Sequence, residues 1–287
     1  MIRLALGLLL TATAAGSSYV SEIEAWRQKR EARLKAEGGW LSVEGLFWLA
    51  EGDTPFGSDK ANAIVLPAHA PAQAGVFTVA NGETRFRLAP GVTGLLGGQR
   101  VDEGLLRPDS SDALALGPVT LHAISRGGKP AIRMKDGESA RRREFKGLRW
   151  YPVRREYRVD ARWVAYASPR SLKIASVIGH VDAMPSPGYA EFSIRGRKVR
   201  LEPVLEEADA TELFFIFRDE TATKETYGAG RFLYADMPKD GRVVLDFNKA
   251  YSPPCAFTPY ATCPLPPKQN RVPVRIEAGE LDPRVLH

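Results

Sequence analysis

In Val76-Phe-Thr-Val-Ala-Asn-Gly-Glu-Thr-Arg-Phe-Arg-Leu88, apolar and polar residues alternate on both sides of Asn81-Gly82. Alternation with a period of two is typical of strands that bury one face. Asn-Gly is a preferred pair in two-residue hairpin turns, because both central residues there need positive φ. The stretch therefore predicts a β-hairpin, and it indicates an all-β class for the region around it.

The same signals recur along the chain after Trp40. Further strands are predicted at Val119–Ile124, Tyr157–Ala167, Leu172–Ile178, Ala190–Ile194, Lys198–Leu205, Leu213–Arg218, Gly230–Tyr234, Arg242–Phe247 and Val272–Ile276. Turns are predicted between strands at Ser186–Gly188, Arg195-Gly196 and Asp240-Gly241. Many short strands at this spacing are typical of sandwiches and barrels. We therefore expect an all-β protein with sandwich- or barrel-like β regions and one N-terminal amphipathic helix.

The predicted helix covers residues 17–38, where Tyr19, Ile23, Trp26 and Leu34 recur at helical spacing. Gly38-Gly39 marks its end. After it we expect a first β region over residues 39–145 and a second over residues 146–287, which ends in a tail rich in proline and cysteine. The length of 287 residues suits one large β-rich domain or two of ordinary size.

The first residues have the pattern of an export signal. Arg3 gives the positive end, Leu4–Leu10 the apolar run and Ala12-Thr13-Ala14 the small residues. We predict a signal peptide over residues 1–16, a periplasmic or secreted protein, and no stable membrane insertion after cleavage. The alternatives are a start codon misplaced by a few codons and a buried N-terminal helix.

The net charge of +6 is modest for this length. Basic residues are densest from Arg141 to Arg162, but acidic residues interrupt them, and several fall at expected outward strand positions. A solvated face explains this pattern better than a nucleic-acid surface, which would need aromatic stacking groups on the same face. We therefore expect no nucleic-acid partner.

Both cysteines lie in the tail, which runs from Asp246 to Asn270 and contains Ser-Pro-Pro-Cys255 and Thr-Cys263-Pro-Leu-Pro-Pro. So many prolines exclude helix and central strand, and long ordered loops are usually functional. In an exported protein, Cys255 and Cys263 would most simply form a disulfide. A reactive or redox thiol pair and inert buried thiols are the alternatives.

A polar stretch, Asp219 to Arg231, precedes this tail. Its side chains, together with those at the end of a later strand, could surround one mouth of the second β region. The candidates for an acid–base pair are Glu225 and Asp246, provided that burial separates their pKa values. The candidate ligand-binding residues are Tyr227, Arg231, Asn248, Tyr251 and Asn270. The alternative is an internal salt-bridge cluster that orients the tail.

Several kinds of site have no support in the sequence. There is no Gly-x-Ser-x-Gly elbow, no phosphate-binding glycine loop before a helix and no metal-ligand spacing. Two thiolates alone do not complete a tetrahedral zinc site. We therefore expect no cofactor and no metal.

One stretch, Phe56-Gly-Ser-Asp-Lys-Ala-Asn-Ala-Ile-Val-Leu-Pro67, resembles the Gly-x-x-x-x-Asn-x-Ile-x-Leu segment of forkhead-associated β-sandwiches. The resemblance covers one strand and turn and implies a sandwich in the first β region. Such domains bind phosphothreonine through an arginine and a later serine. Here Ser58 stands at the arginine position and no Ser-x-x-His follows, so the sequence departs from the phosphate-binding pattern.

A second resemblance spans most of the chain after the predicted signal peptide. It rests on Gly39–Leu49 running on to Phe56–Asp59, on Phe145–Pro152, on Glu225–Arg231 and on the tail from Asp246 to Asn270. These stretches resemble the bacterial family called domain of unknown function 1684. The resemblance implies a bacterial, often exported, β-rich protein and provides no catalytic residues. It supports treating the candidate residues as one constellation.

Three hypotheses follow for the function. The first is binding of a small polar ligand, glycan or peptide at the mouth formed by Glu225, Asp246 and the tail. The second is an envelope hydrolase that uses Glu225 and Asp246 as its acid–base pair. The third is a purely structural polar cluster that holds the tail.

Overall fold

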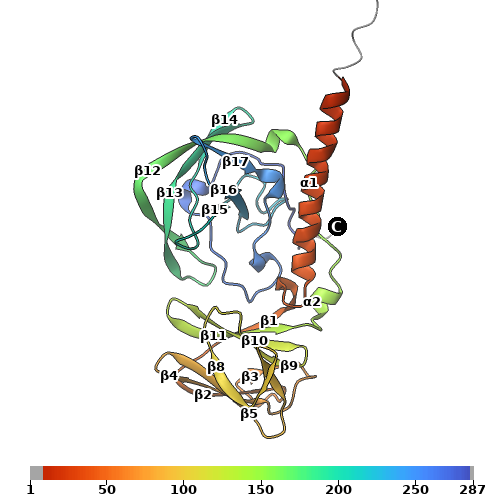
Figure 1. Ribbon diagram of the computed structural model, residues 1–287, viewed down its shortest axis with the longest axis vertical. Helices are drawn as coiled ribbons and strands as arrows, with labels where there is room; N and C mark the ends of the chain where they lie inside the picture. The colour runs from red at the N-terminus through yellow and green to blue at the C-terminus, as the bar shows by residue number, and fades with distance from the viewer. Residues whose placement is uncertain (1–8, 285–287) are drawn as a thin grey trace, which may run out of the picture. The chain divides into compact units, whose positions relative to one another are not determined.

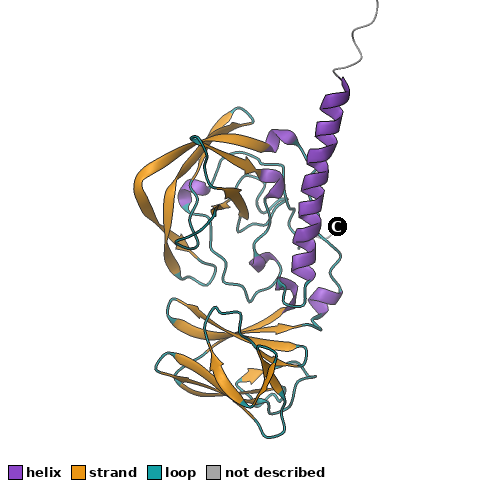
Figure 2. Ribbon diagram, in the orientation of Figure 1, coloured by secondary structure: helices purple, strands orange, loops and turns teal. Residues whose placement is uncertain are grey.

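The computed structural model describes residues 9–284, with side chains from residue 18 onward. The predicted export segment, residues 1–16, thus lies outside the described side chains, and residues 1–8 lie outside the described chain. Strands dominate the fold and one long helix precedes them, so the predicted all-β class is confirmed (Figure 2).

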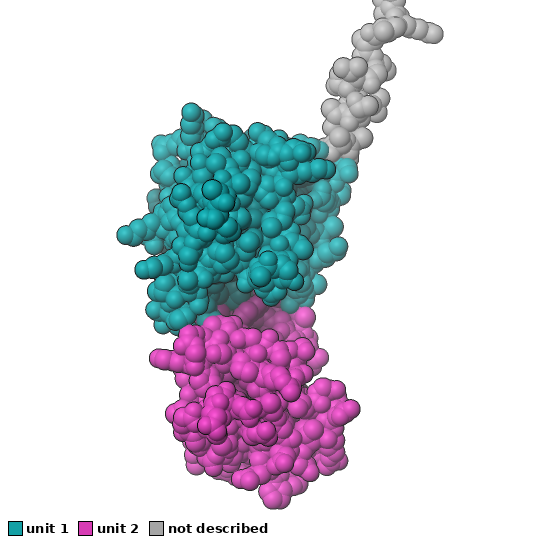
Figure 3. Space-filling view, turned by 60° about the vertical axis from the view of Figure 1, so that its left-hand side comes forward, with its two compact units in different colours: residues 1–33, 147–257, 262–287 teal, residues 34–146, 258–261 magenta. Residues whose placement is uncertain are grey.

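The chain divides into two compact units, coloured separately in Figure 3. Residues 1–33, 147–257 and 262–287 form unit 1, and residues 34–146 and 258–261 form unit 2.

Unit 2 contains two sheets (Figure 1). The first has the order β1-β11-β10-β9-β6-β7 and the second has the order β3-β2-β4-β5-β8. The strands are β1 Val43–Trp48, β2 Gly52–Gly57, β3 Ile64–Val65, β4 Gly75–Ala80, β5 Glu83–Leu88, β6 Gly94–Leu96, β7 Gln99–Val101, β8 Glu103–Leu106, β9 Leu114–Leu116, β10 Val119–Arg126 and β11 Lys129–Asp136. Residues from both sheets share one apolar core, in which the rings of Phe56 and Phe77 stack with centroids 4.3 Å apart. This unit also contains the short helices η1 Trp40–Ser42 and α2 Ala140–Arg143.

The hairpin predicted at Asn81-Gly82 is confirmed. Strands β4 and β5 pair antiparallel, with Ala80 opposite Glu83. Asn81 has φ of 52° and Gly82 has φ of 78°, as a type I′ turn requires. Phe77 and Phe86 face each other across the pair and are both buried, so the alternating pattern does place its apolar face in the core.

Unit 1 contains the long helix and the remaining strands. Helix α1 runs from Leu9 to Lys35 and ends before Gly38-Gly39. The four-stranded sheet has the order β14-β13-β12-β17, and a separate pair joins β15 to β16. The strands are β12 Arg158–Ala175, β13 Val181–Ile194, β14 Arg197–Leu201, β15 Glu212–Phe217, β16 Arg231–Asp236 and β17 Arg242–Asp246. The 3-10 helices are η2 Arg155–Tyr157, η3 Phe247–Lys249, η4 Pro254–Ala256 and η5 Lys268–Asn270. The described strands do not close into a barrel.

The apolar stripe predicted for the helix is largely confirmed. Tyr19, Ile23 and Leu34 are buried, and Trp26 is half-buried. The predicted start at residue 17 differs from the structure, where α1 already begins at Leu9. No helix in the described part of the chain is long and apolar enough to cross a membrane.

Two features of the long hairpin correct the predicted strand boundaries. The two strands predicted over Tyr157–Ala167 and Leu172–Ile178 are one strand, β12, whose register against β13 shifts between Ala165 and Arg170. The turn predicted at Ser186–Gly188 lies inside β13. A side chain at Gly188 would meet the carbonyl oxygen of Val164 at 2.4 Å, so this glycine permits a close backbone approach within a strand.

The last predicted strand, Val272–Ile276, is also wrong. Every second residue of this stretch is buried, as in a strand. Most of its backbone, however, is not hydrogen-bonded to any strand in the described part of the chain. The N–H of Val272 donates to the carbonyl of Arg218 at 2.8 Å, and that of Ile276 donates to the Asp219 carboxylate at 2.7 Å. A side chain thus replaces a neighbouring strand, which the apolar pattern does not reveal.

Candidate functional site

A buried ion pair lies at the base of the site in unit 1. Arg231 begins β16 and Asp219 follows β15, and both side chains are only 1% exposed. Nη2 of Arg231 lies 3.1 Å from Oδ1 of Asp219 and also donates to the carbonyl of Ile276 at 3.0 Å, while Nη1 donates to the carbonyl of Ala278. Thr221 donates to the same carboxylate at 2.9 Å. These bonds fix the turn after β15 against the chain near residue 276.

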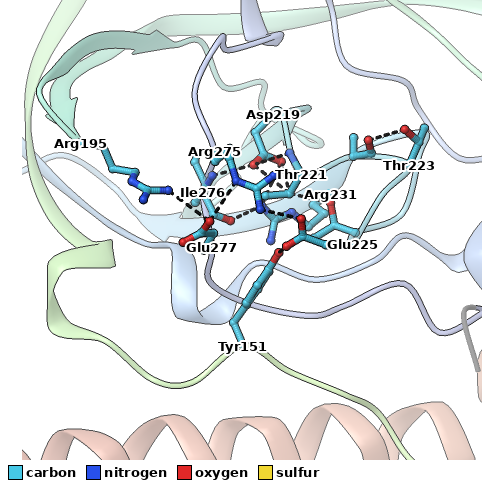
Figure 4. A network of polar contacts seen from close by, with 12 residues as sticks. Tyr151, Arg195, Asp219, Thr221, Thr223, Glu225, Arg231, Arg275, Ile276 and Glu277 are labelled. Atoms are coloured by element: carbon cyan, nitrogen blue, oxygen red, sulfur yellow. Dashed lines mark hydrogen bonds and ion pairs between the residues drawn. The ribbon is translucent and has the colours of Figure 1, made fainter. Parts of the chain in front are cut away.

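Glu225 lies beside Tyr151 and Arg275 (Figure 4), and its side chain is partly exposed. Its Oε2 accepts a hydrogen bond from the phenol of Tyr151, and its Oε1 lies 2.6 Å from Nη2 of Arg275. Nε of Arg275 donates to Glu277 at 3.0 Å, and Arg195 reaches the same Glu277 oxygen at 3.2 Å. We call these five residues the Glu225 cluster; its charged side chains form a chain of alternating sign.

The charges of the Glu225 cluster set its chemistry. The hydrogen bond from Tyr151, followed by that from Arg275, holds the pKa of Glu225 below its usual value. The pKa of Glu277 is also held below its usual value. The hydrogen bond that Glu277 accepts from Arg275 has the largest effect, and the positive charge of nearby Arg195 adds to it. Both carboxylates are therefore ionised at neutral pH, where they accept hydrogen bonds and do not deliver protons.

Asp246 belongs to a different network, which docks helix α1. Its two carboxylate oxygens each accept from the Tyr19 hydroxyl at 3.0 Å. Asn248 is fully buried; its amide donates to Tyr19 at 3.0 Å and to the carbonyl of Arg154 at 2.8 Å. The described residues give Asp246 and Glu225 no hydrogen-bond or ion-pair partner in common. The two candidate acid–base residues are thus not brought into one network.

Tyr251 also packs against the helix. The guanidinium of Arg30 lies 4.5 Å from the ring centroid of Tyr251 and donates to the carbonyl of Ser252 at 2.9 Å. Beside it is Glu280, a carboxylate with 0% exposure, whose Oε2 lies 3.5 Å from Nε of Arg30. Burial raises the pKa of Glu280 to about 7, against the opposing charge of Arg30. Glu280 is not among the candidates that the sequence indicates, because nothing near it in the chain marks it as buried.

Asn270 and Tyr227 hold the tail at two points. The Asn270 amide donates to the carbonyls of Glu202 and Ile216 at 2.8 and 2.9 Å, and its oxygen accepts from the N–H of Glu202 at 2.9 Å. Tyr227 donates to the carbonyl of Cys255 at 3.0 Å. Asn270 is 1% exposed and Tyr227 is 7% exposed, so both side chains are buried at the points where they hold the tail.

Cys255 and Cys263 are neighbours, as their expected pairing requires. The N–H of Cys255 donates to Sγ of Cys263 at 3.2 Å. Both residues are present as thiols, so the disulfide stays a prediction.

The structure therefore divides the predicted constellation into separate networks. Glu225 is held by Tyr151 and Arg275, and Arg231 is paired with Asp219. Asp246, Asn248 and Tyr251 dock the helix, and Asn270 fastens the tail. The partners that sequence reasoning missed are Tyr151, Asp219, Arg195, Arg275 and Glu277. Tyr151 lies in the family-like stretch Phe145–Pro152, and Asp219 begins the polar stretch that ends at Arg231. Nothing in the nearby sequence predicts that Tyr151 contacts Glu225 or that Asp219 pairs with Arg231. No group of three or more potential metal ligands occurs among residues 9–284.

Comparison with known proteins gives one family match. The model of a family described as "Protein of unknown function (DUF1684)" matches residues 143–281, which lie almost entirely in unit 1. No curated protein matches the chain.

Several solved structures show limited similarity. An uncharacterized protein of Haloarcula marismortui is 31% identical over 49% of this chain and 78% of its own, with a TM-score of 0.42. The FHA-2 domain of the Mycobacterium tuberculosis ABC transporter Rv1747 is 26% identical over 30% of this chain and 77% of its own, with a TM-score of 0.24. The FhaA FHA domain, solved in complex with the intracellular domain of Rv3910, is 14% identical over 31% of this chain and 97% of its own, with a TM-score of 0.24. These TM-scores are too low to transfer a fold or an activity.

Proposed function

We propose that the protein binds a small polyhydroxyl ligand at the Glu225 cluster. Residues 143–281 match the model of the DUF1684 family, which is described as a protein of unknown function, so the proposal rests on the site itself. A polyhydroxyl ligand is one member of the class that the sequence suggests, which comprises small polar ligands, glycans and peptides. Export, predicted from residues 1–16, stays part of the proposal, with the protein acting in the periplasm or outside the cell.

One observation carries the proposal: the Glu225 cluster is charged, prearranged and partly open to solvent. The Glu225 side chain is 36% exposed, that of Arg275 34% and that of Glu277 25%. The buried Asp219–Arg231 pair beneath fixes the backbone that carries them. Groups held in place before binding lose less conformational entropy when a ligand arrives.

The alternation of charge favours hydroxyl groups as the bound chemistry. A hydroxyl donates one hydrogen bond and accepts others, so neighbouring hydroxyls of a sugar suit carboxylates beside guanidinium groups. Glu225 and Glu277 would accept, and Arg275 and Arg195 would donate. A ligand with a single strong charge would leave one half of the cluster facing a like charge.

The hydrolase alternative has less support. An acid–base pair needs one carboxyl that is protonated near neutral pH, and the contacts of Glu225 lower its pKa. Asp246 is 8% exposed and its oxygens accept from Tyr19 and Asn248. A structural role for the buried residues is compatible with binding at the exposed ones.

Titration calorimetry with the full chain tests the proposal. We would titrate monosaccharides, disaccharides, free amino acids and short carboxylic acids into the wild-type protein and into Arg275→Gln. The expected result is saturable binding of at least one sugar, weakened at least about tenfold in the variant, which corresponds to about 1.4 kcal/mol. The matched control is Arg242→Gln, which removes an exposed arginine paired with Asp160 elsewhere in unit 1.

Two results would contradict the proposal. One is the absence of sugar binding across the panel at millimolar concentrations. The other is a sugar affinity that Arg275→Gln and Arg242→Gln leave equally unchanged. Binding of amino acids alone would move the ligand class away from polyhydroxyl compounds. Circular dichroism of each variant checks that the fold is retained.

A further inference from the structure

The two cysteines of the tail form a pair with unequal access to solvent. Cys263 is 5% exposed, while Cys255 is only partly buried. The N–H of Cys255 lies 3.2 Å from Sγ of Cys263, and the two side chains also interact. An accessible thiol beside a protected one is the arrangement that thiol–disulfide exchange uses, with one attacking and one resolving sulfur.

The surroundings of Cys255 favour its thiolate. Tyr227 donates to the carbonyl of Cys255 at 3.0 Å, and the guanidinium of Arg284 lies 4.5 Å from the Tyr227 ring centroid. Asp282 holds that guanidinium through Nη2 at 2.9 Å. A positive charge and hydrogen-bond donors near a sulfur stabilise its anionic form.

These contacts lower the pKa of Cys255 to about 7. The hydrogen bond with Cys263 has the largest effect; burial opposes it, and Tyr227 and Arg284 reinforce it. The titratable and charged groups that act on the thiol are Cys263, Tyr227 and Arg284, and Asp282 is paired with the arginine. A thiol with this pKa near neutral pH combines a large thiolate fraction with good nucleophilicity.

The tail also suits repeated opening and closing of a sulfur bridge. The prolines on both sides restrict the backbone whether or not the sulfurs are bonded. Val177 donates to the carbonyl of Cys263 at 3.0 Å, and Leu265 donates to that of Ala175 at 2.7 Å, so the chain after Cys263 is held against the β12–β13 hairpin. The pair thus keeps its geometry without the bridge.

We propose that Cys255 and Cys263 are a thiol–disulfide exchange pair whose substrate is a low-molecular-weight disulfide. The Cys255 thiolate attacks one sulfur of the substrate, and the first substrate thiolate leaves. The Cys263 thiolate then attacks Sγ of Cys255 and expels the second substrate thiolate. The protein dithiol is oxidised to a disulfide and the substrate is reduced to two thiols, which take up the two protons. This proposal does not rest on sugar binding.

To test this, the full chain is incubated with oxidised and reduced glutathione at defined ratios, and its mass is measured by intact mass spectrometry. The wild-type protein should lose two hydrogen masses in oxidised glutathione and regain them in reduced glutathione. Cys263→Ser should accumulate one glutathione adduct, because its Cys255 attacks and nothing resolves the product. Cys255→Ser should form at least about tenfold less glutathione adduct than Cys263→Ser, since its remaining sulfur, that of Cys263, is buried.

Labelling of the unmutated protein covers the case in which a variant does not fold. Iodoacetamide should modify Cys255 well before Cys263, with a rate that rises through pH 7, as peptide mapping would show. Equal labelling of both thiols, equal adducts in both variants or a dithiol that oxidised glutathione leaves unchanged would each overturn the proposal. A bridge that reduced glutathione cannot open would overturn it too, because the disulfide would then be structural.

Discussion

The phenol of Tyr19 lies 3.0 Å from both carboxylate oxygens of Asp246 and joins helix α1 to the end of strand β17. The two residues are 227 positions apart in the chain. Asn248 completes the contact, since its amide donates to the Tyr19 oxygen and its N–H donates to Asp246 at 3.1 Å. Asp246, which the sequence suggests as a catalytic residue, thus holds helix α1 through Tyr19.

Removing this phenol tests how much the contact stabilises the fold. Tyr19→Phe deletes a buried donor to a carboxylate, so the free energy of unfolding should fall by about 1.5–3 kcal/mol. Urea unfolding followed by circular dichroism measures it. Glu22→Gln is the control, because it removes only the exposed contact with Lys249 and should change stability by less than about 1 kcal/mol. Equal effects of the two variants would contradict a docking role for Tyr19.

Breaking the buried pair beneath the Glu225 cluster should have a larger effect. Arg231→Gln leaves the Asp219 carboxylate buried without its cation, and such changes destabilise proteins by about 3–5 kcal/mol. Thermal unfolding should show the loss directly. Arg242→Gln, which removes an exposed partner of Asp160, should leave the melting temperature close to that of the wild type. A melting temperature of Arg231→Gln close to that of Arg242→Gln would refute this prediction.

Asn270 offers a test that separates shape from hydrogen bonding. Asn270→Asp keeps the size of the side chain but cannot donate to the carbonyls of Glu202 and Ile216. We expect it to destabilise the protein by about 2–4 kcal/mol, because it places a carboxylate where two carbonyls lose their donors. Gln73→Glu, which makes the same change of amide to carboxylate at an exposed position, is the matched control. Chemical unfolding of both variants would show whether the amide has this role.

Glu280 predicts how stability depends on pH. Its pKa rises on folding from the usual 4.5 to about 7, so the folded state holds the proton more tightly than the unfolded state. The contribution of Glu280 is therefore complete below about pH 4.5 and disappears as the pH rises to about 7. Across this window the loss is on the order of 3 kcal/mol.

Comparison of pH profiles isolates this effect from the other carboxylates. The free energy of unfolding of wild type minus that of Glu280→Gln should decrease between pH 4.5 and pH 7 and then stay level. Glu207→Gln, at an exposed position, should show no such trend. A difference between wild type and Glu280→Gln that is constant or increasing with pH would show that Glu280 does not bind a proton on folding.

Hairpins are the part of the fold that the sequence predicts best. The turns at Asn81-Gly82, Arg195-Gly196 and Asp240-Gly241 all have positive φ at both residues. Turn chemistry acts within four residues, so it can be read locally. The register shift of β12 against β13 and the close approach at Gly188 depend on a neighbouring strand, and the prediction divided that hairpin incorrectly.

The candidate site shows the same limit. The sequence marks Glu225, Arg231 and Asp246 as polar residues in unusual surroundings, but spacing cannot say which of them meet. Asp246 is engaged by Tyr19 and Asn248, while Glu225 is engaged by Tyr151 and Arg275. Buried charges require partners, and those partners come from wherever the packed chain brings them.

By itself the sequence determined the β class, the helix and its apolar face, the glycine turns at Asn81-Gly82, Arg195-Gly196 and Asp240-Gly241, and the place of the cysteine tail. These features depend on backbone preferences and on side-chain periods of two or 3.6 residues. Only the tertiary structure decided that Asp246 docks the helix, that Glu280 is buried and that Glu225 stays open to solvent. Exposure and charge pairing depend on which distant segments pack together, and no local pattern contains that information.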